Sequence, residues 1–288
     1  GKEWEEAMAQ QFKESKILVI DDLADRAHKA NILVDQNFWT DNRGEKYTRF
    51  VNKNCKILIG PKYALINKVK IENIANSKES DKTRVMVYFG GSDTKGTNMC
   101  LDIAKEKEFQ NIIFDVILGQ NIFEEELEEA LKAKGPNTYI YRNLKSLDKV
   151  MIKSDIAIGA GGSTNWERIS IGLPAIVAST SHDQVEIARN LHNYQVIHYL
   201  GSISEISAWH IKKALSKYLN GTLKFKKDNQ LCDGWGLQRI LAHMQYYDEI
   251  IEREVTIKDK EQLLEWRNEI EVRWNSFNNK KIVESEHL

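Results

Sequence analysis

Strand-like and helix-like segments alternate over residues 83–248, and this alternation constrains the fold more than any other feature of the sequence. Apolar runs such as 85–89 and 112–118 predict buried strands, and the segments between such runs have helical spacing. The alternation is typical of a doubly wound parallel α/β sheet, whose ligands bind beyond the carboxyl ends of the strands. Further strands are predicted at 138–141, 155–158, 175–178 and 196–200, and helices at 97–107, 124–134, 147–153, 163–171, 184–192, 206–219 and 237–247.

The N-terminal part of the chain predicts a smaller α/β unit. A helix is expected over 3–12, followed by strands at 16–22, 32–35 and 56–61. The strand at 16–22 is a continuous apolar run that ends in acidic residues, which favours a parallel strand covered on both faces. We interpret residues 1–66 as the back half of an incomplete Rossmann-like domain.

A glycine-rich stretch within residues 159–174 carries the clearest indication of binding. Gly161 and Gly162 follow a predicted strand, and a helix is expected to begin at Ser163 or Thr164. Glycine permits close backbone approach, and the first N–H groups of a helix lack partners within it. Together these features predict a seat for a diphosphate. The structural alternative is a turn that serves packing alone, with Ser163 or Thr164 as the helix cap.

Composition argues against several classes of function. The 288 residues include 41 basic and 42 acidic side chains, so the net charge of −1 provides no field to hold nucleic acid or an acidic membrane. Cys55, Cys100 and Cys232 lack metal-ligand spacing and favour a reducing compartment. No apolar run approaches the ~18 residues of a membrane span, and residues 1–6 do not resemble a signal peptide. We expect a cytoplasmic protein without a metal site, and its oligomeric state stays open.

Several strings resemble one known family. AIGAGGSTNWERISIGLPAIV at 157–177 is similar to the nucleotide-binding signature of the UDP-sugar hydrolases of pseudaminic acid biosynthesis. IDDLADR-H at 20–28, LVDQN at 33–37 and GPKYALI at 60–66 resemble strings that this family carries in the same order. DG-x-G-x-x-RI at 233–240 extends the resemblance, although a capping turn before a final packing helix also accounts for it. The family is related in fold to glycosyltransferases of the MurG type, which have two facing Rossmann-like domains (the GT-B architecture).

The resemblance implies hydrolysis of UDP-2,4-diacetamido-2,4,6-trideoxy-β-L-altropyranose. Water would attack the anomeric carbon and UDP would leave, which requires a base and stabilisation of the leaving group. No cofactor is implied. Glu167 would hold the ribose, and Asp183 stands where the family more often has Asn. The residues expected to contact UDP or the sugar are Tyr63, Gly90, Gly91, Ser92, Asp93, Gly161, Gly162, Ser163, Thr164, Glu167, Asp183 and Gln184.

The general base is not identified by the sequence. His28 and His182 are weak candidates, because structural roles account for both. Family members carry a glycine-rich loop with a histidine, G-x-G-H-x-x-R in outline, before the IDDLADR-H string, and the 288 residues contain no such string. From this we expect a chain truncated at its N-terminus, which binds UDP and has low or no turnover.

Two further segments differ in character from the α/β units. Residues 67–82 are polar and predict a linker between domains. In residues 249–288, a strand is expected at 254–257 and a helix at 259–269. This segment resembles the start of a GNAT-type N-acetyltransferase domain. No Gln/Arg-x-x-Gly-x-Gly string for acetyl-CoA is present, so we expect no acetyl transfer.

Other functions remain open at this point. A MurG-like glycosyltransferase would use an acceptor hydroxyl in place of water, and a non-catalytic UDP-binding fragment would show binding without turnover. An epimerase of the UDP-GlcNAc 2-epimerase type fits the fold, but not the WER and DDLADR strings. Formation of free sugar and UDP without any acceptor would distinguish hydrolysis from transfer.

Overall fold

A computed structural model divides the chain into two compact units, Gly1–Gln245 and Tyr246–Leu288. The structure describes residues 2–12, 15–69, 82–91, 95–119, 121, 123–228, 230–245, 256–269 and 281. Most of the predicted linker, residues 70–81, lies outside these ranges. The predicted domain boundaries stay predictions.

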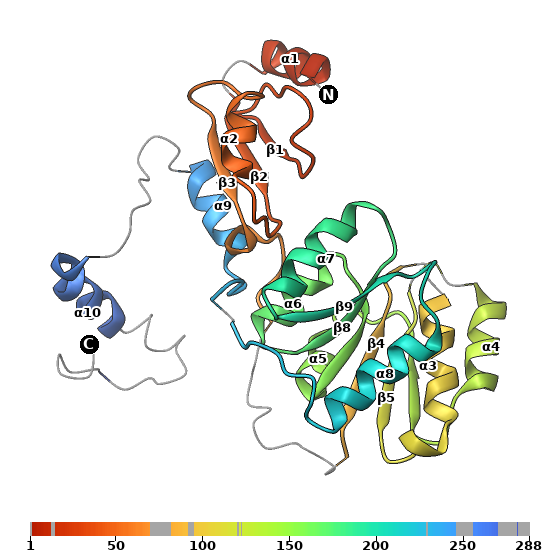
Figure 1. The fold of residues 1–288 in the computed structure, drawn as a ribbon. Coiled ribbons are helices and arrows are strands. Elements are labelled where there is room, and N and C mark those ends of the chain that lie inside the picture. The colour runs from red at the N-terminus through yellow and green to blue at the C-terminus, as the bar shows by residue number, and fades with distance from the viewer. Residues whose placement is uncertain are drawn as a thin grey trace. The chain divides into compact units, whose positions relative to one another are not determined.

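The first unit contains a six-stranded parallel sheet with the strand order β6-β5-β4-β7-β8-β9 (Figure 1). The order reverses between β4 and β7, which pair through Tyr88 and Gly159 at their carboxyl ends. The elements of this part are β4 (Arg84–Tyr88), α3 (Lys95–Lys105), η3 (Lys107–Phe109), β5 (Ile113–Ile117), α4 (Glu124–Ala133), β6 (Thr138–Tyr141), α5 (Asp148–Lys153), β7 (Ile156–Ala160), α6 (Thr164–Ser170), β8 (Ala175–Ser179), α7 (Asp183–Asn193), β9 (Ile197–Ser202), α8 (Ala208–Leu219) and α9 (Gly236–Gln245). The doubly wound sheet predicted from the alternation is confirmed.

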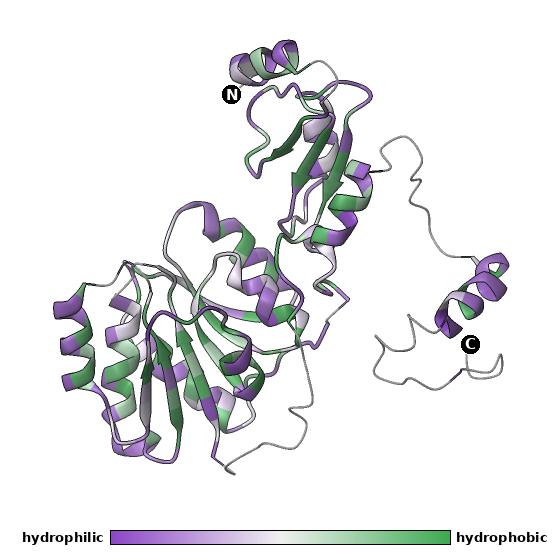
Figure 2. Ribbon diagram, turned by 180° about the vertical axis from the view of Figure 1, so that it is seen from behind, coloured by the Kyte–Doolittle hydropathy of each residue, from purple (hydrophilic) through white to green (hydrophobic). Residues whose placement is uncertain are grey.

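Two buried clusters cover the two faces of this sheet. Val85 and Val87 of β4 pack with residues of α3, α4 and α8. Met86, between them, packs on the other face with residues of α5, α6 and α7. This alternation follows from the two-residue period of a strand. In Figure 2 the sheet strands are mostly hydrophobic, whereas the helices alternate between hydrophobic and hydrophilic positions.

A second, three-stranded parallel sheet has the order β1-β2-β3. Its elements are α1 (Lys2–Gln11), β1 (Leu18–Ile20), β2 (Ile32–Asp35), α2 (Arg43–Thr48), β3 (Lys56–Ile59) and the 3₁₀ turn η1 (Pro61–Tyr63). β2 is fully buried, as its apolar sequence predicts. The prediction for β1 was wrong in one respect: the side chain of Ile20 is 57% exposed, and among the described strands β1 lies at an edge of the sheet. An apolar run therefore did not imply cover on both faces.

The acidic residues at the carboxyl ends of β1 and β2 form a buried network. The hydroxyl of Tyr47 lies 3.1 Å from a carboxylate oxygen of both Asp21 and Asp35. Asp21 also pairs with Arg26 at 2.6 Å and accepts the N–H of Ala24. The IDDLADR and LVDQN strings thus meet in space, although α2, which supplies Tyr47, was not predicted.

The DG-x-G-x-x-RI string joins α9 to the three-stranded part. Arg239 donates two hydrogen bonds to Asp233, at 2.7 and 2.6 Å, and a third to the carbonyl oxygen of Lys62 at 2.9 Å. A Cβ at Gly236 would lie 2.3 Å from the carbonyl oxygen of Ala64, so only glycine fits there. This placement agrees with the structural reading of the string as a turn before a packing helix.

The Arg239→Gln variant is expected to lower the free energy of unfolding by about 1 kcal/mol, because the ion pair is bidentate but partly exposed. Urea denaturation measures this difference. Lys132→Gln is the control, since Lys132 pairs with Glu128 on an exposed face of α4 and is expected to change the free energy little. An equal effect of both variants would contradict a special role for the Arg239 pair.

In the second unit, the described residues form a 3₁₀ turn, η4 (Ile257–Asp259), and α10 (Lys260–Asn268). The strand predicted at 254–257 was wrong at Ile257, because Thr256 caps this turn through the carboxylate of Asp259. Residues 254 and 255 and most of the GNAT-like stretch lie outside the described residues. None of the described helices has the length and hydropathy of a membrane-spanning segment.

Candidate functional site

Two glycine turns lie side by side where the strand order of the large sheet reverses. Gly90 and Gly91 follow β4, and the loop 161–163 follows β7. The two strands approach so closely that a Cβ at Gly159 would lie 2.0 Å from the carbonyl oxygen of Tyr88. Such a reversal of strand order at the carboxyl edge is where open α/β sheets bind their ligands.

A pocket of about 460 Å³ opens between the two turns. Its floor and walls come from the ends of β4 and β7, the start of α6 and the turn between β8 and α7. The lining residues are Tyr88, Phe89, Gly90, Gly91, Ala160, Gly162, Ser163, Thr164, Thr180 and Gln184. Six of the twelve residues predicted to contact UDP or the sugar are among them: Gly90, Gly91, Gly162, Ser163, Thr164 and Gln184.

Backbone N–H groups in the second turn are available to a ligand. The N–H of Gly161 donates to the carbonyl oxygen of Ala178 at 3.1 Å and is therefore occupied. Within the described part of the chain, the N–H groups of Gly162, Ser163 and Thr164 have no acceptor. Unpaired donors directed at a polar pocket are suited to phosphate oxygens.

Gln184 adds side-chain donors to this wall. Its Oε1 accepts the N–H of Thr180 at 3.0 Å and lies 3.3 Å from the Thr180 hydroxyl, which fixes the orientation of the amide. Its Nε2 is consequently directed toward Gly162, where an added Cβ would lie 3.5 Å from it. The Nε2 hydrogens can therefore donate to the same ligand as the backbone amides.

The other predicted contacts lie outside the pocket lining. Gly161 lies behind the lining and packs against Val177 and Gln184. Asp183 and His182 are exposed at the start of α7. Ser92 and Asp93 lie outside the described residues.

Glu167 lies next to the pocket without lining it. The side chain is half-buried, and burial raises the pKa of its carboxyl group, an effect that Arg168 opposes. Tyr88 does line the pocket, and burial and the nearby Glu167 charge raise its pKa. The carboxylate is thus close to the pocket wall, and its contact with a ribose stays a prediction.

His28 and Tyr63 have structural surroundings. His28 is 4% exposed, and its Nδ1 lies 2.9 Å from Glu5. Its Nε2 lies 3.5 Å from Asp21. Tyr63 is 2% exposed and packs at the start of α9, next to Gly236. Sequence reasoning considered both for the cleft, but apolar packing and ion pairing enclose them.

Several residues at the site were not singled out from the sequence. Tyr88 and Thr180 line the pocket, and each precedes or follows a predicted strand end, which is the signal that could have indicated them. Asp22, in the IDDLADR string, is half-buried. Burial, Asp21 and Asp183 together raise the pKa of Asp22. The negative charge of Asp183, at the start of α7, therefore acts on a carboxyl group in the loop after β1.

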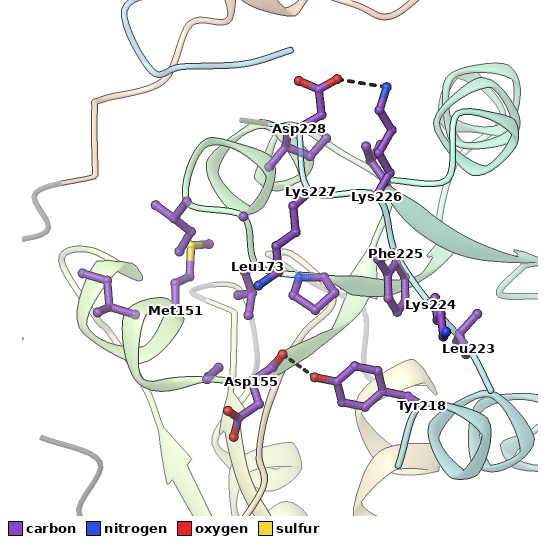
Figure 3. A pocket seen from close by; sticks show the side chains of 17 residues that line it. Met151, Asp155, Leu173, Tyr218, Leu223, Lys224, Phe225, Lys226, Lys227 and Asp228 are labelled. Carbon is purple, nitrogen blue, oxygen red and sulfur yellow. Dashed lines mark hydrogen bonds and ion pairs between the residues drawn. The ribbon is translucent and has the colours of Figure 1, made fainter. Parts of the chain in front are cut away.

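A larger pocket, of about 610 Å³, lies at the opposite edge of the sheet (Figure 3). Apolar side chains such as Met151, Leu173 and Phe225 line it, and lysines stand at its rim. Lys226 pairs with Asp228 at 3.1 Å, and Lys227 extends over Leu173 (Figure 3). This pocket is at the amino ends of the strands and does not include either glycine turn.

Among the described residues, no group of three or more His, Cys, Asp or Glu could hold a metal ion.

Comparisons with solved structures assign the fold to a class. S. aureus MnaA, solved with UDP, has a TM-score of 0.58 and 14% identity, over 88% of this chain and 82% of that one. MurG of Acinetobacter baumannii has a TM-score of 0.56 and 14% identity, over 83% of this chain and 76% of that one. The protein therefore has the α/β architecture shared by GT-B glycosyltransferases and UDP-N-acetylglucosamine 2-epimerases, as the sequence predicted.

Two sequence relatives align with most of the chain. MJ1062 of Methanocaldococcus jannaschii, an uncharacterized protein, is 28% identical over 286 residues, which cover 92% of this chain and 55% of the relative. The spore coat polysaccharide biosynthesis protein SpsG of Bacillus subtilis is 23% identical over 241 residues, 81% of this chain and 70% of the relative. The chain spans about half the length of the M. jannaschii relative. No protein-family model matches the chain.

Proposed function

We propose that this protein is a UDP-sugar enzyme whose pocket between the two glycine turns holds the diphosphate of UDP. The observation that carries the proposal is a set of three N–H groups, from Gly162 to Thr164, that lie at the pocket and have no acceptor among the described residues. The Nε2 group of Gln184 adds donors on the same side. Fixed donors of this kind stabilise negative charge as it develops on a leaving diphosphate.

The reaction that we propose is hydrolysis of a UDP-2,4-diacetamido-2,4,6-trideoxyhexose, a step of pseudaminic acid biosynthesis. The resemblance of the strings at 20–28, 33–37, 60–66 and 157–177 to hydrolases of that pathway supports this choice. The name of the B. subtilis relative, a spore coat polysaccharide biosynthesis protein, agrees with a role in sugar metabolism. The UDP found with MnaA agrees with a nucleotide at the same type of fold.

A glycosyltransferase reaction is the second candidate, because MurG shares the fold. The two reactions use the same leaving group and differ in the nucleophile. Incubation with the UDP-sugar in the absence of any acceptor separates them, with products followed by ³¹P NMR and mass spectrometry. Free sugar and UDP support hydrolysis. UDP release only after an acceptor is added supports transfer, and UDP binding without any release supports a binding protein.

The Gln184→Glu variant tests the pocket itself. Glutamate keeps the length of the side chain and the acceptor for Thr180, but it replaces the Nε2 donors with negative charge. We expect the Kd for UDP, measured by isothermal titration calorimetry, to rise at least about 10-fold, since hydrogen bonds to charged groups contribute about 1.5–3 kcal/mol.

Two control variants accompany this measurement. Gln238→Glu introduces the same charge at an exposed position of α9 and is expected to leave the Kd unchanged. Lys227→Ala removes a positive charge from the rim of the other pocket and is also expected to leave it unchanged. A loss of UDP binding in Lys227→Ala, with normal binding in Gln184→Glu, would place the nucleotide at the opposite edge of the sheet and overturn the proposal.

A further inference from the structure

Arg168 is a fully buried arginine directly behind the pocket. It lies on α6, and only 2% of the residue is exposed. Its Nη2 donates to the carbonyl oxygen of Ala160 and to Oδ1 of Asn165, both at 2.7 Å, and its Nε donates to the carbonyl oxygen of Thr164 at 3.2 Å. No carboxylate in the described ranges lies within ion-pair distance of the guanidinium. Burial lowers the pKa of Arg168 to about 10, and the nearby charge of Glu167 opposes this decrease, so the guanidinium is charged at neutral pH.

Asn165 connects this arginine to the glycine turn. The Oδ1 of Asn165 accepts the bond from Arg168, so its Nδ2 is left to donate, and it does so to the carbonyl oxygen of Gly161 at 2.9 Å. Asn165 is 1% exposed, and its backbone N–H donates to the carbonyl oxygen of Gly162 at 3.0 Å. The N–H of Trp166 holds the carbonyl oxygen of Ser163 at 2.9 Å.

These bonds determine where the free N–H groups point. The described backbone contains no cis peptide bond, and in a trans peptide the carbonyl and the following N–H point in opposite directions. Because the carbonyls of Gly161, Gly162 and Ser163 are all held toward α6, the N–H groups of the following residues are directed away from α6. Those N–H groups belong to Gly162, Ser163 and Thr164, which line the pocket.

We propose that Asn165 and Arg168 are positioning residues. The side chain of Asn165 orients the Gly161–Gly162 peptide so that the N–H of Gly162 faces the diphosphate, and Arg168 fixes Asn165 and places positive charge behind the turn. The inference rests on the proposed function, since it assigns these residues to the same pocket. Neither side chain lines the pocket. Their role is to fix peptide orientation in advance, so that little reorganisation is needed when the anion binds.

The Asn165→Asp variant tests this inference with little risk to the fold. Aspartate has the same size and would pair with Arg168, but it cannot donate to the carbonyl of Gly161, and it cancels the positive charge. We expect the Kd for UDP to rise by about 10- to 100-fold, while the affinity for uridine, which has no phosphate, changes less than about twofold. Calorimetry measures the Kd for UDP, and ligand-observed NMR measures the affinity for uridine.

Arg168→Lys and Arg168→Met complete the series. Lysine keeps the charge but cannot make all three bonds of the planar fork, so an intermediate loss of UDP affinity is expected. Arg168→Met removes the charge, and its affinity for UDP is expected to fall at least as much as that of Asn165→Asp. Matched controls are Asn193→Asp and Arg189→Met on exposed positions of α7, which are expected to leave both affinities unchanged.

The possible outcomes separate the inference from the proposed function. If the wild-type protein does not bind UDP, the proposed function fails. If the wild-type protein binds UDP and Asn165→Asp binds it within about twofold, the positioning role is overturned. A parallel loss of uridine and UDP affinity would also overturn it, because that pattern indicates general damage to the site rather than to the phosphate contact.

Discussion

Replacing Gly159 with alanine is expected to lower the free energy of unfolding by about 3 kcal/mol or more, and to abolish UDP binding. The new methyl group would lie 2.0 Å from the carbonyl oxygen of Tyr88 and 3.3 Å from Nη1 of Arg168. The first contact is with backbone, which cannot move without separating β4 from β7. Because the two glycine turns follow these two strands, separation of the strands would also widen the pocket.

Urea denaturation and calorimetry with UDP measure the two effects. Gly91→Ala is the control for stability in the neighbouring turn, because among the described residues its added methyl group would meet the side-chain amide of Asn121 at an ordinary contact distance of 3.5 Å. We expect that variant to fold with nearly unchanged stability. A Gly159→Ala protein as stable as Gly91→Ala would show that the strands are not held as closely as described.

A second large effect is expected from Asp35, whose ionisation opposes folding. Burial raises the pKa of Asp35 from 3.8 to about 6, despite hydrogen bonds from Asn37, Trp39 and Tyr47. The hydroxyl of Tyr47 has one proton but lies 3.1 Å from both Asp35 and Asp21. Asp21 has a lowered pKa, because hydrogen bonds and Arg26 outweigh its burial. We therefore expect Asp35, rather than Asp21, to carry a proton below about pH 6.

The direction of the pH dependence follows from this assignment. Between pH 3.8 and about 6 the folded protein binds more protons at Asp35 than the unfolded chain, so this group's contribution to stability falls as the pH rises. The full loss, reached above pH 6, is about 3 kcal/mol. Other carboxyl groups with lowered pKa values, Asp21 among them, act in the opposite direction, so only a comparison between variants isolates Asp35.

Asp35→Asn is the variant for that comparison, because its amide does not titrate. Loss of the bond from Trp39 Nε1, which shares Oδ2 with Tyr47, would contribute equally at both pH values. We expect the free energy of unfolding of the variant minus that of wild type to increase by about 2.5 kcal/mol between pH 4 and pH 8, because a small part of the wild-type loss has already occurred at pH 4. Denaturation series at both pH values measure it. A difference that does not change with pH would mean that Asp35 is ionised throughout. Tyr47→Phe separates the contribution of the shared hydroxyl.

Sequence reasoning located most of the large sheet, because its signals are local. Most strands from β4 to β9 are short apolar runs, and the predicted helices have apolar faces, so the order of elements follows from periodicity. It was less successful in the smaller part. The six-residue helix α2 contains a glycine and shows no clear period, and the exposure of Ile20 depends on which strand lies at the edge of the sheet.

Some residues of the candidate site were indicated by the sequence, and others were not. The glycines of 161–162 and 90–91 were indicated by their positions after predicted strands, with a turn that serves packing alone as the open alternative. Asn165 and Arg168 were not indicated, although they lie within the same string. Polar side chains early in a short helix normally face solvent, and only the burial of α6 against β7 turns these two toward the carbonyls of the loop.

By itself, the sequence determined the alternating α/β elements and the two glycine turns proposed to hold a diphosphate, because both depend on residues that are close together along the chain. Tertiary structure alone decided that β4 and β7 are neighbours, which brings turns some seventy residues apart to one pocket. It also decided that His28 and Tyr63 are enclosed by packing and that a buried arginine lies behind the free amides. Those facts depend on strand order and burial, which are set by contacts between residues far apart in the chain.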